Sequence, residues 1–390
     1  MDAYRVIDRC LTLARLTEEP GHITRTFLSP PMHEVHRLVR GWMEEAGMRV
    51  SVDAVGNVRG TWGRGSRLMI GSHLDTVPDA GAFDGILGVM LGIELVAGIK
   101  EHGKVPYGIE VVGFSEEEGV RFGVPFIGSR ALVGDPVMDE AVLDAIRAFG
   151  LDPAHIPDAM MDGDLKGYLE FHIEQGPVLD RNNLLLGVVD GIVGQRRAEV
   201  QFHGRAGHAG TTPMAHRGDA LSAAAEWIGV MEKTAVEQDG VATVGRLGVQ
   251  PGAANVIPGL VRATLDVRHR DGERLKTLIE VLKISAEEIA MRRGITTSWE
   301  LRSMNPPVAM DRAMTEMLAS AVDAAGRRPF RLSSGAGHDA MVLARKVPVA
   351  MLFLRSPGGI SHHPDETVTE DVVEAALNAG MRFLENWRPA

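Results

Sequence analysis

Short apolar runs and stretches with a helical period alternate along most of the chain, which is typical of an α/β protein. The apolar runs are of the kind found in buried strands of a parallel sheet; they are residues 67–72, 109–114, 169–172 and 347–354. Apolar residues at helical spacing predict three helices in the same part of the chain, and two shorter stretches predict further strands. The helices are expected over 2–16, 31–47 and 85–100, and the two strands near 48–55 and 57–62.

The pattern changes between residues 192 and 304, where alternating strands and amphipathic helices predict a smaller α+β unit. Strands are expected over 197–203, 241–249, 260–269 and 295–302, and helices over 215–234 and 272–291. A chain of 390 residues is also long for one hydrophobic core. We therefore expect an α/β domain with a mixed, mostly parallel sheet, formed by 1–191 and 305–390, and an inserted domain formed by 192–304.

The composition narrows the possible partners. Apolar residues make up 45% and charged residues 24% of the chain, as in soluble globular proteins. A formal charge of -11 argues against nucleic acid or an anionic membrane as a partner. The chain starts without a basic segment followed by an apolar run, so we expect a cytoplasmic protein. Cys10 is the one cysteine, which excludes an intrachain disulfide, and its helical spacing predicts a packing role.

Imidazole and carboxylate groups stand at or just beyond the ends of the four apolar runs. His73 and Asp75 follow the first, residues 116–118 (Glu-Glu-Glu) the second, His172 ends the third, and a Pro-Gly-Gly loop leads from the fourth to His362. The carboxyl ends of neighbouring parallel strands meet at one edge of a sheet, where ligands gather. These side chains are also the donors that divalent cations prefer. The sequence therefore predicts a metal site at this edge.

Each histidine or aspartate also has an ordinary structural interpretation when it is taken alone. Asp84 has two oxygens that could bridge two cations, but it could equally cap the helix expected over 85–100. His33 and His36 have the spacing of a helical metal pair, yet no suitably placed carboxylate accompanies them, so we interpret both as surface residues. His338 either lines the site or starts a helix.

Taken together, the motifs resemble the M20 metallopeptidase clan and, within it, the branch of N-carbamoyl-L-amino acid hydrolases and allantoate amidohydrolases. The matching segments span almost the whole chain in the order that the family has. They are Gly-Ser-His-Leu-Asp-Thr (71–76), Phe-Asp-Gly (83–85), Glu-Glu-Gly-x-Arg-Phe (117–122), Gly-Ser-Arg-Ala (128–131), His-Ile-Glu-Gln-Gly-Pro (172–177), Val-Gly-Gln-Arg-Arg (193–197), His-Ala-Gly-Thr-Thr-Pro-Met (208–214), Asn-Val-Ile-Pro (255–258), Asp-Val-Arg-His (266–269), Ser-Gly-Ala-Gly-His-Asp-Ala (334–340) and Gly-Ile-Ser-His-His-Pro (359–364).

This resemblance implies two divalent metal ions per subunit that share Asp84. His73 and His172 would hold one ion, and Glu118 and His362 the other. In this branch His172 stands where many peptidases of the clan have an aspartate. Zinc, manganese, cobalt and nickel all accept such a donor set, so the native metal stays open.

The resemblance also implies roles for the acids near these ligands. Asp75 would orient the ring of His73 and raise its basicity. Glu117 would be the general base that takes a proton from water and passes it to the leaving nitrogen. A cis peptide bond is expected between Asp84 and Gly85, as is often found in the clan.

Five residues would bind the substrate by the same resemblance. The inserted unit would serve as a lid and as the interface of a homodimer, in which His208 reaches across to stabilise the oxyanion. The planar fork of Arg268 suits a substrate carboxylate. The five residues are Gln175, Gln195, His208, Asn255 and Arg268.

The sequence thus predicts a dinuclear-metal amidohydrolase that cleaves the ureido C–N bond of a small carboxylate-bearing N-carbamoyl compound and releases ammonia and carbon dioxide. Allantoate and N-carbamoyl-L-amino acids are both candidate substrates, and the motifs do not decide between them. Two alternatives remain: an aminoacylase or dipeptidase on the same fold, and a metal-free binding protein that kept the fold. The complete ligand set and the presence of Glu117 argue against the second alternative.

Overall fold

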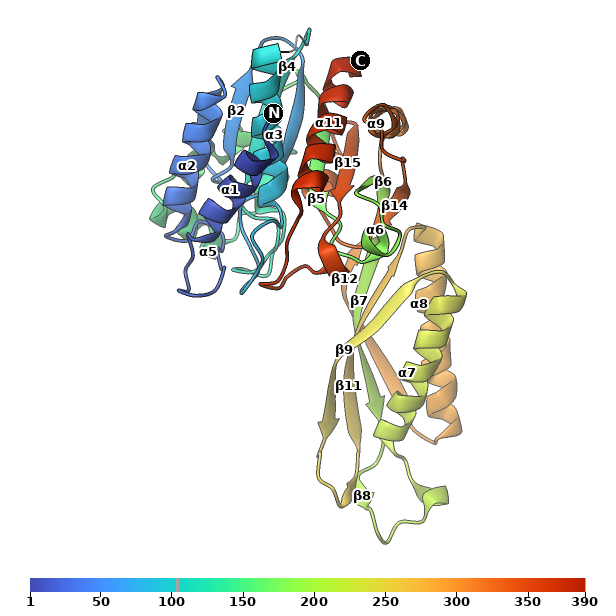
Figure 1. Cartoon of the computed structure of the whole chain (residues 1–390). Helices are drawn as coiled ribbons and strands as arrows, with labels where there is room; N and C mark the ends of the chain where they lie inside the picture. The colour runs from blue at the N-terminus through green and yellow to red at the C-terminus, as the bar shows by residue number, and fades with distance from the viewer. Residues whose placement is uncertain (103–104, 390) are drawn as a thin grey trace. The chain divides into compact units, whose positions relative to one another are not determined.

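The computed structural model describes residues 1–102 and 105–389, and these form two compact units (Figure 1). The larger unit comprises Met1–Asp190 and Ala309–Ala390, and the smaller comprises Gly191–Val308. In the described part of the chain, no helix has both the length and the apolar character needed to cross a membrane.

A mixed sheet of nine strands forms the centre of the larger unit within the described residues. Its four central strands run in the order β4-β3-β5-β15 and are parallel, whereas β1, β2 and β6 pair with their neighbours in antiparallel fashion. The expected mixed, mostly parallel sheet is therefore confirmed. The strands are β1 (Arg49–Val52), β2 (Val58–Trp62), β3 (Arg67–His73), β4 (Gly108–Phe114), β5 (Leu165–Ile173), β6 (Leu186–Ile192), β13 (Val308–Ala309), β14 (Arg331–Ser334) and β15 (Val349–Leu354).

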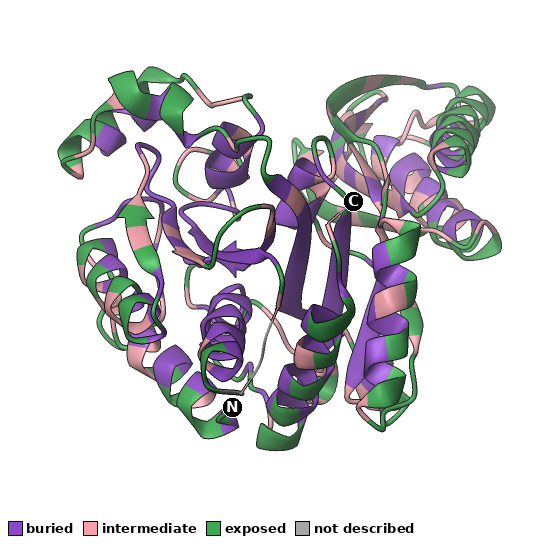
Figure 2. Ribbon diagram, turned by 90° about the horizontal axis from the view of Figure 1, so that it is seen from above, coloured by how far each residue is buried: buried purple, intermediate pink, exposed green. Residues whose placement is uncertain are grey.

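Helices surround this sheet, and Figure 2 shows the central strands buried and the helices exposed on their outer sides. A continuous apolar core joins the sheet to α1, α2, α3, α9 and α11, while a second apolar cluster lies around α4, α5 and η1. The helices are α1 (Ala3–Ala14), α2 (Met32–Glu45), α3 (Ile86–His102), α4 (Ile127–Leu132), α5 (Glu140–Ala148), α6 (Val178–Arg181), α9 (Arg312–Ala324), α10 (Asp339–Leu343) and α11 (Glu370–Asn386), with 3-10 turns η1 (Pro153–Ala159) and η3 (Pro357–Gly359).

Helix α3 lies directly against the central strands and is buried around most of its circumference. Its glycines permit this close approach, because a Cβ atom at Gly88 would lie 2.2 Å from the carbonyl oxygen of Phe171 in β5. A Cβ at Gly92 would lie 3.1 to 3.2 Å from side chains of β3 and β4. The helix begins two residues after Asp84, so its packing on the sheet sets the position of that aspartate.

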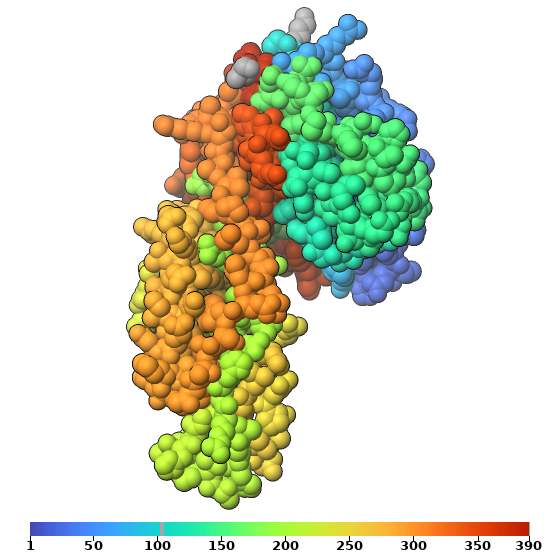
Figure 3. Space-filling view, turned by 180° about the vertical axis from the view of Figure 1, so that it is seen from behind, coloured from blue at the N-terminus to red at the C-terminus, as the bar shows by residue number. Residues whose placement is uncertain are grey.

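The smaller unit is an antiparallel four-stranded sheet, ordered β12-β7-β11-β9, with two helices packed on one face. A short two-stranded ribbon, β8 with β10, projects beyond the sheet, and its surroundings form the yellow-green tip in Figure 3. The elements are β7 (Gly194–His203), β8 (Gly207–His208), η2 (Met214–His216), α7 (Ala220–Glu237), β9 (Val241–Gln250), β10 (Val256–Ile257), β11 (Leu260–His269), α8 (Gly272–Arg292) and β12 (Thr296–Asn305).

Two side chains outside the sheet test the packing predictions. Cys10 is fully buried in the apolar core, as its spacing on α1 predicted. The interpretation of His36 as a surface residue is wrong, because only 7% of this residue is exposed and its ring packs edge-on against Phe149. His33 stays exposed and stacks on the same ring. The aromatic residue that covers His36 comes from a distant segment, which a local helical period does not reveal.

We expect His36 to make the protein less stable in mild acid. Burial, with a smaller effect from His33, lowers the pKa of His36 from its ordinary 6.5 to about 4. Between these values the unfolded chain binds a proton that the folded chain does not, so the free energy of unfolding falls as the pH falls. Between about pH 7.5 and about pH 5 this group should account for about 2 kcal/mol. Urea unfolding of wild type and His36→Leu at both pH values measures the effect.

The matched control is His33→Leu, which changes an exposed imidazole on the same helix and beside the same Phe149 ring. This variant should retain most of the wild-type loss of stability in acid. An equal loss in wild type and in His36→Leu would contradict the prediction.

Candidate metal centre

Four neighbouring strands bring the predicted ligands to one edge of the sheet in the larger unit. β3 ends at His73 and β5 contains His172 as its last residue but one, while the acids at 116–118 follow β4 directly. His362 lies in the loop between β15 and α11. These four strands are parallel neighbours, so the prediction that their carboxyl ends meet is confirmed.

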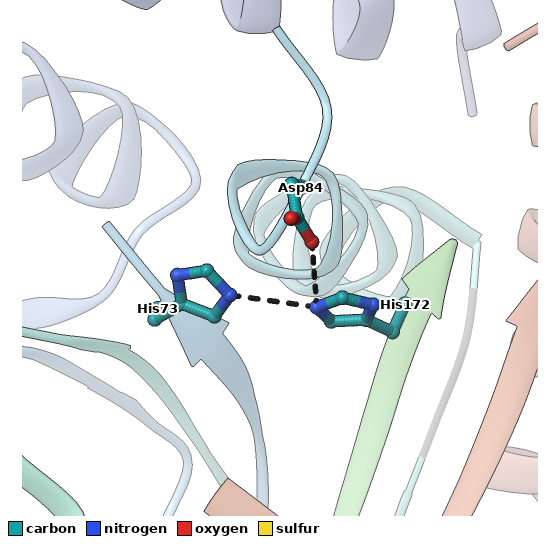
Figure 4. A group of neighbouring side chains, drawn as sticks. All are labelled: His73, Asp84 and His172. Carbon is teal, nitrogen blue, oxygen red and sulfur yellow. Dashed lines mark hydrogen bonds and ion pairs between the residues drawn. The ribbon is translucent and has the colours of Figure 1, made fainter. Parts of the chain in front are cut away.

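One group of donors consists of His73, Asp84 and His172, which point toward one another in Figure 4. The Nε2 atoms of the two histidines are 3.4 Å apart, and Oδ1 of Asp84 is 3.2 Å from Nε2 of His172. All three residues are at least 98% buried, with exposed fractions of 1%, 2% and 1%. The two imidazoles and the carboxylate therefore face one another in an interior shielded from water.

The backbone fixes which nitrogen of each ring carries the proton. Nδ1 of His73 lies 3.1 Å from the carbonyl oxygen of Asp75, and Nδ1 of His172 lies 2.9 Å from that of Ile173. A carbonyl oxygen only accepts, so each Nδ1 donates and each Nε2 keeps its lone pair. Two lone pairs and a carboxylate oxygen that converge in this way suit a divalent cation.

A second group consists of Asp84, Glu118 and His362. Nε2 of His362 lies 3.2 Å from Oδ2 of Asp84 and 3.3 Å from Oε1 of Glu118. Asp84 thus turns Oδ1 toward the first group and Oδ2 toward the second. A carboxylate in this position can serve two cations at once, whereas the helix-cap alternative would use its oxygens on backbone N–H groups.

Asp75 connects the loop after β3 to the loop after β4. Its Oδ1 accepts from the backbone N–H of Glu117 at 3.0 Å, and its Oδ2 accepts from that of Glu118 at 3.1 Å. Oδ1 also lies 3.3 Å from Nδ1 of His73. One buried carboxylate therefore orients an imidazole and the backbone of two acids together.

Burial shifts the ionisation of the acids in this region. It raises the pKa of Glu117 well above its ordinary value, and the charge of Glu118 raises it further. Burial also raises the pKa of Glu118, while a hydrogen bond with His362 opposes the rise. At Asp84 burial acts in the same direction, but the hydrogen bond with His362 and the charge of His172 outweigh it, so the pKa falls. Cations among these groups would offset the repulsion between their carboxylates.

The expected cis peptide bond between Asp84 and Gly85 is not found; in the described ranges the cis bond is Gln250–Pro251. The chain turns from Asp84 into α3 through Gly85, which has a φ of 71°. A Cβ at this glycine would lie 2.4 Å from the ring of His73, so a side chain cannot be accommodated. The chain therefore enters α3 through a left-handed glycine and not through the expected cis bond.

Gln175 is the one proposed substrate residue in the larger unit, and it lies at the two donor groups. Its Nε2 donates to both oxygens of Asp84 at 3.1 Å. Its backbone has a φ of 59°, an uncommon conformation outside glycine. The preceding Glu174 accepts from the N–H groups of Val178 and Leu179 at 2.7 Å and so fixes the turn that carries Gln175.

His338 begins α10 and also lies beside the first donor group. It is 1% exposed, its ring centroid is 4.5 Å from that of His172, and its Nε2 is 2.9 Å from Oγ of Ser334. Both interpretations of this residue therefore hold. It packs against a proposed ligand without being part of a donor group found in the described residues.

The other proposed substrate residues form two pairs within the smaller unit. Gln195 and Arg268 are directly paired across β7 and β11, and both donate to Asp266, at 2.8 and 2.9 Å. His208 lies in β8 and Asn255 directly precedes β10, and the N–H of Ala209 donates to the carbonyl oxygen of Asn255. Sequence reasoning missed Asp266, although its position two residues before Arg268 places both on one face of the strand.

The structure does not bring these two pairs together in one chain. The ribbon adjoins the end of β11 at Leu260, and Arg268 lies eight residues further along the same strand (268 − 260). At about 3.3 Å per residue the separation is about 26 Å. A small substrate held by Arg268 is therefore out of reach of His208 from the same chain.

The backbone also sets the hydrogen-bonding role of His208. Its Nδ1 accepts from the N–H groups of Gly210 and Thr211, at 3.0 and 3.2 Å. Nδ1 is then the acceptor nitrogen, and the neutral ring carries its proton on Nε2. The exposed imidazole is thereby prepared to donate from Nε2 to an acceptor outside its own loop.

The fold and these histidine–carboxylate groups define a hydrolase with a candidate site for divalent metal ions. The sequence model that describes peptidase family M20/M25/M40 matches residues 69–386 of the chain. The chain therefore belongs to this family. The resemblance inferred from the motifs is confirmed.

Curated relatives and solved structures match over nearly the whole chain. Allantoate deiminase 2 from Glycine max is 37% identical, over 97% of this chain and 88% of its own length. N-carbamoyl-L-amino acid amidohydrolase from Geobacillus stearothermophilus is 38% identical, over 99% and 98%. The crystal structure of an amidase of the hydantoinase/carbamoylase family from Burkholderia multivorans has a TM-score of 0.92 at 33% identity, covering 98% of this chain and 97% of its own.

Proposed function

We propose that the protein is a metal-dependent amidohydrolase that cleaves the ureido C–N bond of allantoate or of an N-carbamoyl-L-amino acid, with release of ammonia and carbon dioxide. The observation that carries this proposal is the position of Asp84, which turns one oxygen to each of two donor groups. Relatives that share more than a third of the sequence are named for these two activities.

Two divalent ions fit the donors that the chain presents. His73 and His172 would hold one ion and Glu118 and His362 the other, with Asp84 shared between them. Ions in these positions would polarise the ureido oxygen and lower the pKa of bound water to about 7. The donor set accepts zinc, manganese, cobalt or nickel.

Glu117 is placed to move the proton in this reaction. Its carboxylate is buried beside His73 and Glu118, and Asp75 holds its backbone N–H. From this position it takes a proton from the attacking water on one of its oxygens and delivers it to the departing nitrogen. The amine leaves as a neutral molecule only after it receives that proton.

Two residues of the smaller unit supply the remaining contacts in this proposal. A ureido carbonyl is a poor electrophile because both nitrogens donate into it, so a donor aimed at its oxygen lowers the barrier. The Nε2–H of His208 is such a donor. The guanidinium of Arg268, held in place by Asp266, offers a planar fork to the substrate carboxylate.

We further propose that these contacts come from two subunits of a homodimer. Arg268 and His208 lie at opposite ends of β11, so one chain cannot apply both to a single small molecule. Exposed apolar side chains occur on α8 and on the two edge strands, β9 and β12, which lie at opposite sides of the sheet, and an apolar edge strand is a place where another chain can pair. They include Val241, Leu247, Ile284, Met291, Leu301 and Met304.

A panel of substrates tests the proposed activity. Purified protein loaded with manganese or zinc should release ammonia from allantoate or from N-carbamoyl-L-amino acids, measured by a coupled ammonia assay. N-acetyl amino acids and dipeptides are the control substrates, since they lack the terminal amide nitrogen. Turnover of these controls without ammonia from any ureide would instead establish the aminoacylase or dipeptidase alternative.

Elemental analysis separates the enzyme from the metal-free binding protein. Two equivalents of metal per chain are expected after dialysis against the active metal, and Asp84→Ala should lose both because both groups use its oxygens. A wild-type protein that retains no metal would favour the binding protein.

A further inference from the structure

Glu366 is a buried carboxylate that contacts the backbone of the shared aspartate. Its Oε1 accepts from the N–H of Phe83 and from the N–H of Asp84, both at 3.0 Å. Only 4% of the residue is exposed, and its Oε2 has no hydrogen-bond partner in the described part of the chain. Burial of a carboxylate that gains only two hydrogen bonds from the backbone is costly, which indicates that this side chain has a role at its position.

The surroundings hold this side chain against the Asp84 loop. A Cβ at Gly81 would lie 2.3 Å from Cβ of Glu366, so a glycine is needed for the two segments to touch. Glu366 itself comes four residues after His362, and its N–H donates to the carbonyl oxygen of His363. The contact therefore joins the loop that carries Asp84 to the loop that carries His362.

Asp75 makes the same kind of contact elsewhere in the site. It accepts from the consecutive N–H groups of Glu117 and Glu118 and so joins the loops after β3 and β4. Glu366 accepts from the consecutive N–H groups of Phe83 and Asp84 and joins the loops after β3 and β15. The two carboxylates thus hold together the three loops that carry Glu118, Asp84 and His362.

We propose that Glu366 is a positioning residue for metal binding: its hydrogen bonds to the Phe83 and Asp84 backbone fix the direction in which the Asp84 carboxylate points and keep the His362 loop beside it. This inference rests on the proposed function in so far as Asp84 is a shared ligand. Asp84 must present its two oxygens to two different groups, and a rotation of its backbone would turn one oxygen away. Glu366 acts through Asp84 and does not touch a reacting atom.

The test compares three substitutions by metal affinity, measured by competition with a chromogenic chelator. Glu366→Gln keeps the length and an acceptor oxygen, so it should bind metal within about threefold of wild type. Glu366→Asp keeps the charge but is one methylene shorter, and Glu366→Ala has no acceptor. Both should weaken metal binding by about 10- to 100-fold, the loss typical of residues that orient ligands.

The matched control is Asp271→Ala. Asp271 also accepts from two consecutive N–H groups, those of Glu273 and Arg274, but at the start of α8 in the smaller unit. This variant should lower the thermal midpoint and leave metal affinity unchanged. Circular dichroism and thermal unfolding of every variant identify any that does not fold, and the contrast between Glu366→Gln and Glu366→Asp still decides the question if Glu366→Ala is one of them.

A double mutant shows whether the effect passes through Asp84. Once Asp84→Asn has weakened metal binding, the addition of Glu366→Ala should weaken it by less than threefold, about the error of non-interacting sites. Full additivity would overturn the proposal, as would wild-type affinity in Glu366→Ala and Glu366→Asp, or a loss in Glu366→Gln equal to that in Glu366→Ala. A wild-type protein without metal would instead refute the proposed function, so the two failures are distinguishable.

Discussion

Glu117→Gln should lower the turnover number for the ureide substrate by about a thousandfold or more, while the protein still binds two metal ions. The amide has nearly the same shape as the carboxylate, but it cannot take a proton from water or return it to the departing nitrogen. General acid–base catalysis by a positioned side chain contributes about 10²- to 10⁴-fold, and in the proposed function one residue performs both transfers. Ammonia release under saturating substrate measures the turnover number, and elemental analysis measures the metal content.

Glu116→Gln is the matched control, since it makes the same change one residue earlier in the chain. Glu116 is also buried, and its Oε1 accepts from the N–H of Val120, a bond that the amide oxygen of glutamine can keep. It belongs to no donor group found in the described residues. Turnover in this variant should stay within about tenfold of wild type. A comparable loss in both variants would show that a disturbance of this loop, rather than removal of the proton carrier, explains the effect of Glu117→Gln.

The sheet edge could be predicted from the sequence because four of the five predicted ligands follow or end an apolar run, whereas Asp84 precedes the helix expected over 85–100. The run that precedes His73 and the run that ends at His172 lie in buried parallel strands, as their composition indicated. Parallel strands must end at the same edge, so four local patterns together specified a three-dimensional cluster. The hydrophobic pattern alone therefore predicted which strand ends lie together, although it did not predict the conformations of the loops.

The residues that hold the loops could not be predicted in this way. Glu366 contacts Asp84 across 282 residues of sequence, and no spacing or period marks such a contact. His36 was misassigned for the same reason, since the ring that buries it belongs to a distant segment. The turn after Asp84 was expected to contain a cis bond, but Gly85 provides an alternative geometry that a motif alone does not distinguish.

The positions of the proposed substrate residues on the strands were also beyond the motifs. The resemblance assigned His208 to the partner subunit without giving a distance; in the structure Arg268 lies near one end of β11, and the ribbon that carries His208 adjoins the other end, at Leu260. A list of residues gives no distances. The ten consecutive residue pairs between β7 and β11 give the position of each residue along the strand, and hence its distance from the others. In the proposed function, this separation means that one site needs contacts from two chains.

His208→Ala should lower turnover by about 10²- to 10³-fold, the loss typical for removal of one oxyanion donor, with little change in metal content. Activity should recover when this variant is mixed with Glu117→Gln and the subunits are allowed to exchange. In a hybrid dimer of two-fold symmetry, the site with an intact Glu117 would receive an intact His208 from the other chain. Random exchange makes half of the dimers hybrids with one repaired site in two, so about a quarter of wild-type activity should return.

In the proposed dimer, activity recovers only because one site takes Glu117 from one chain and His208 from the other. Gln175 contacts Asp84 in the larger unit, so mixing Glu117→Gln with Gln175→Ala leaves a defect in every site and should restore no activity. Two different affinity tags, purified in series, establish that hybrids have formed. If hybrids form and turnover does not recover, His208 acts in the same chain as Glu117. The separation of about 26 Å between His208 and Arg268 argues against that outcome for any small substrate that contacts both residues.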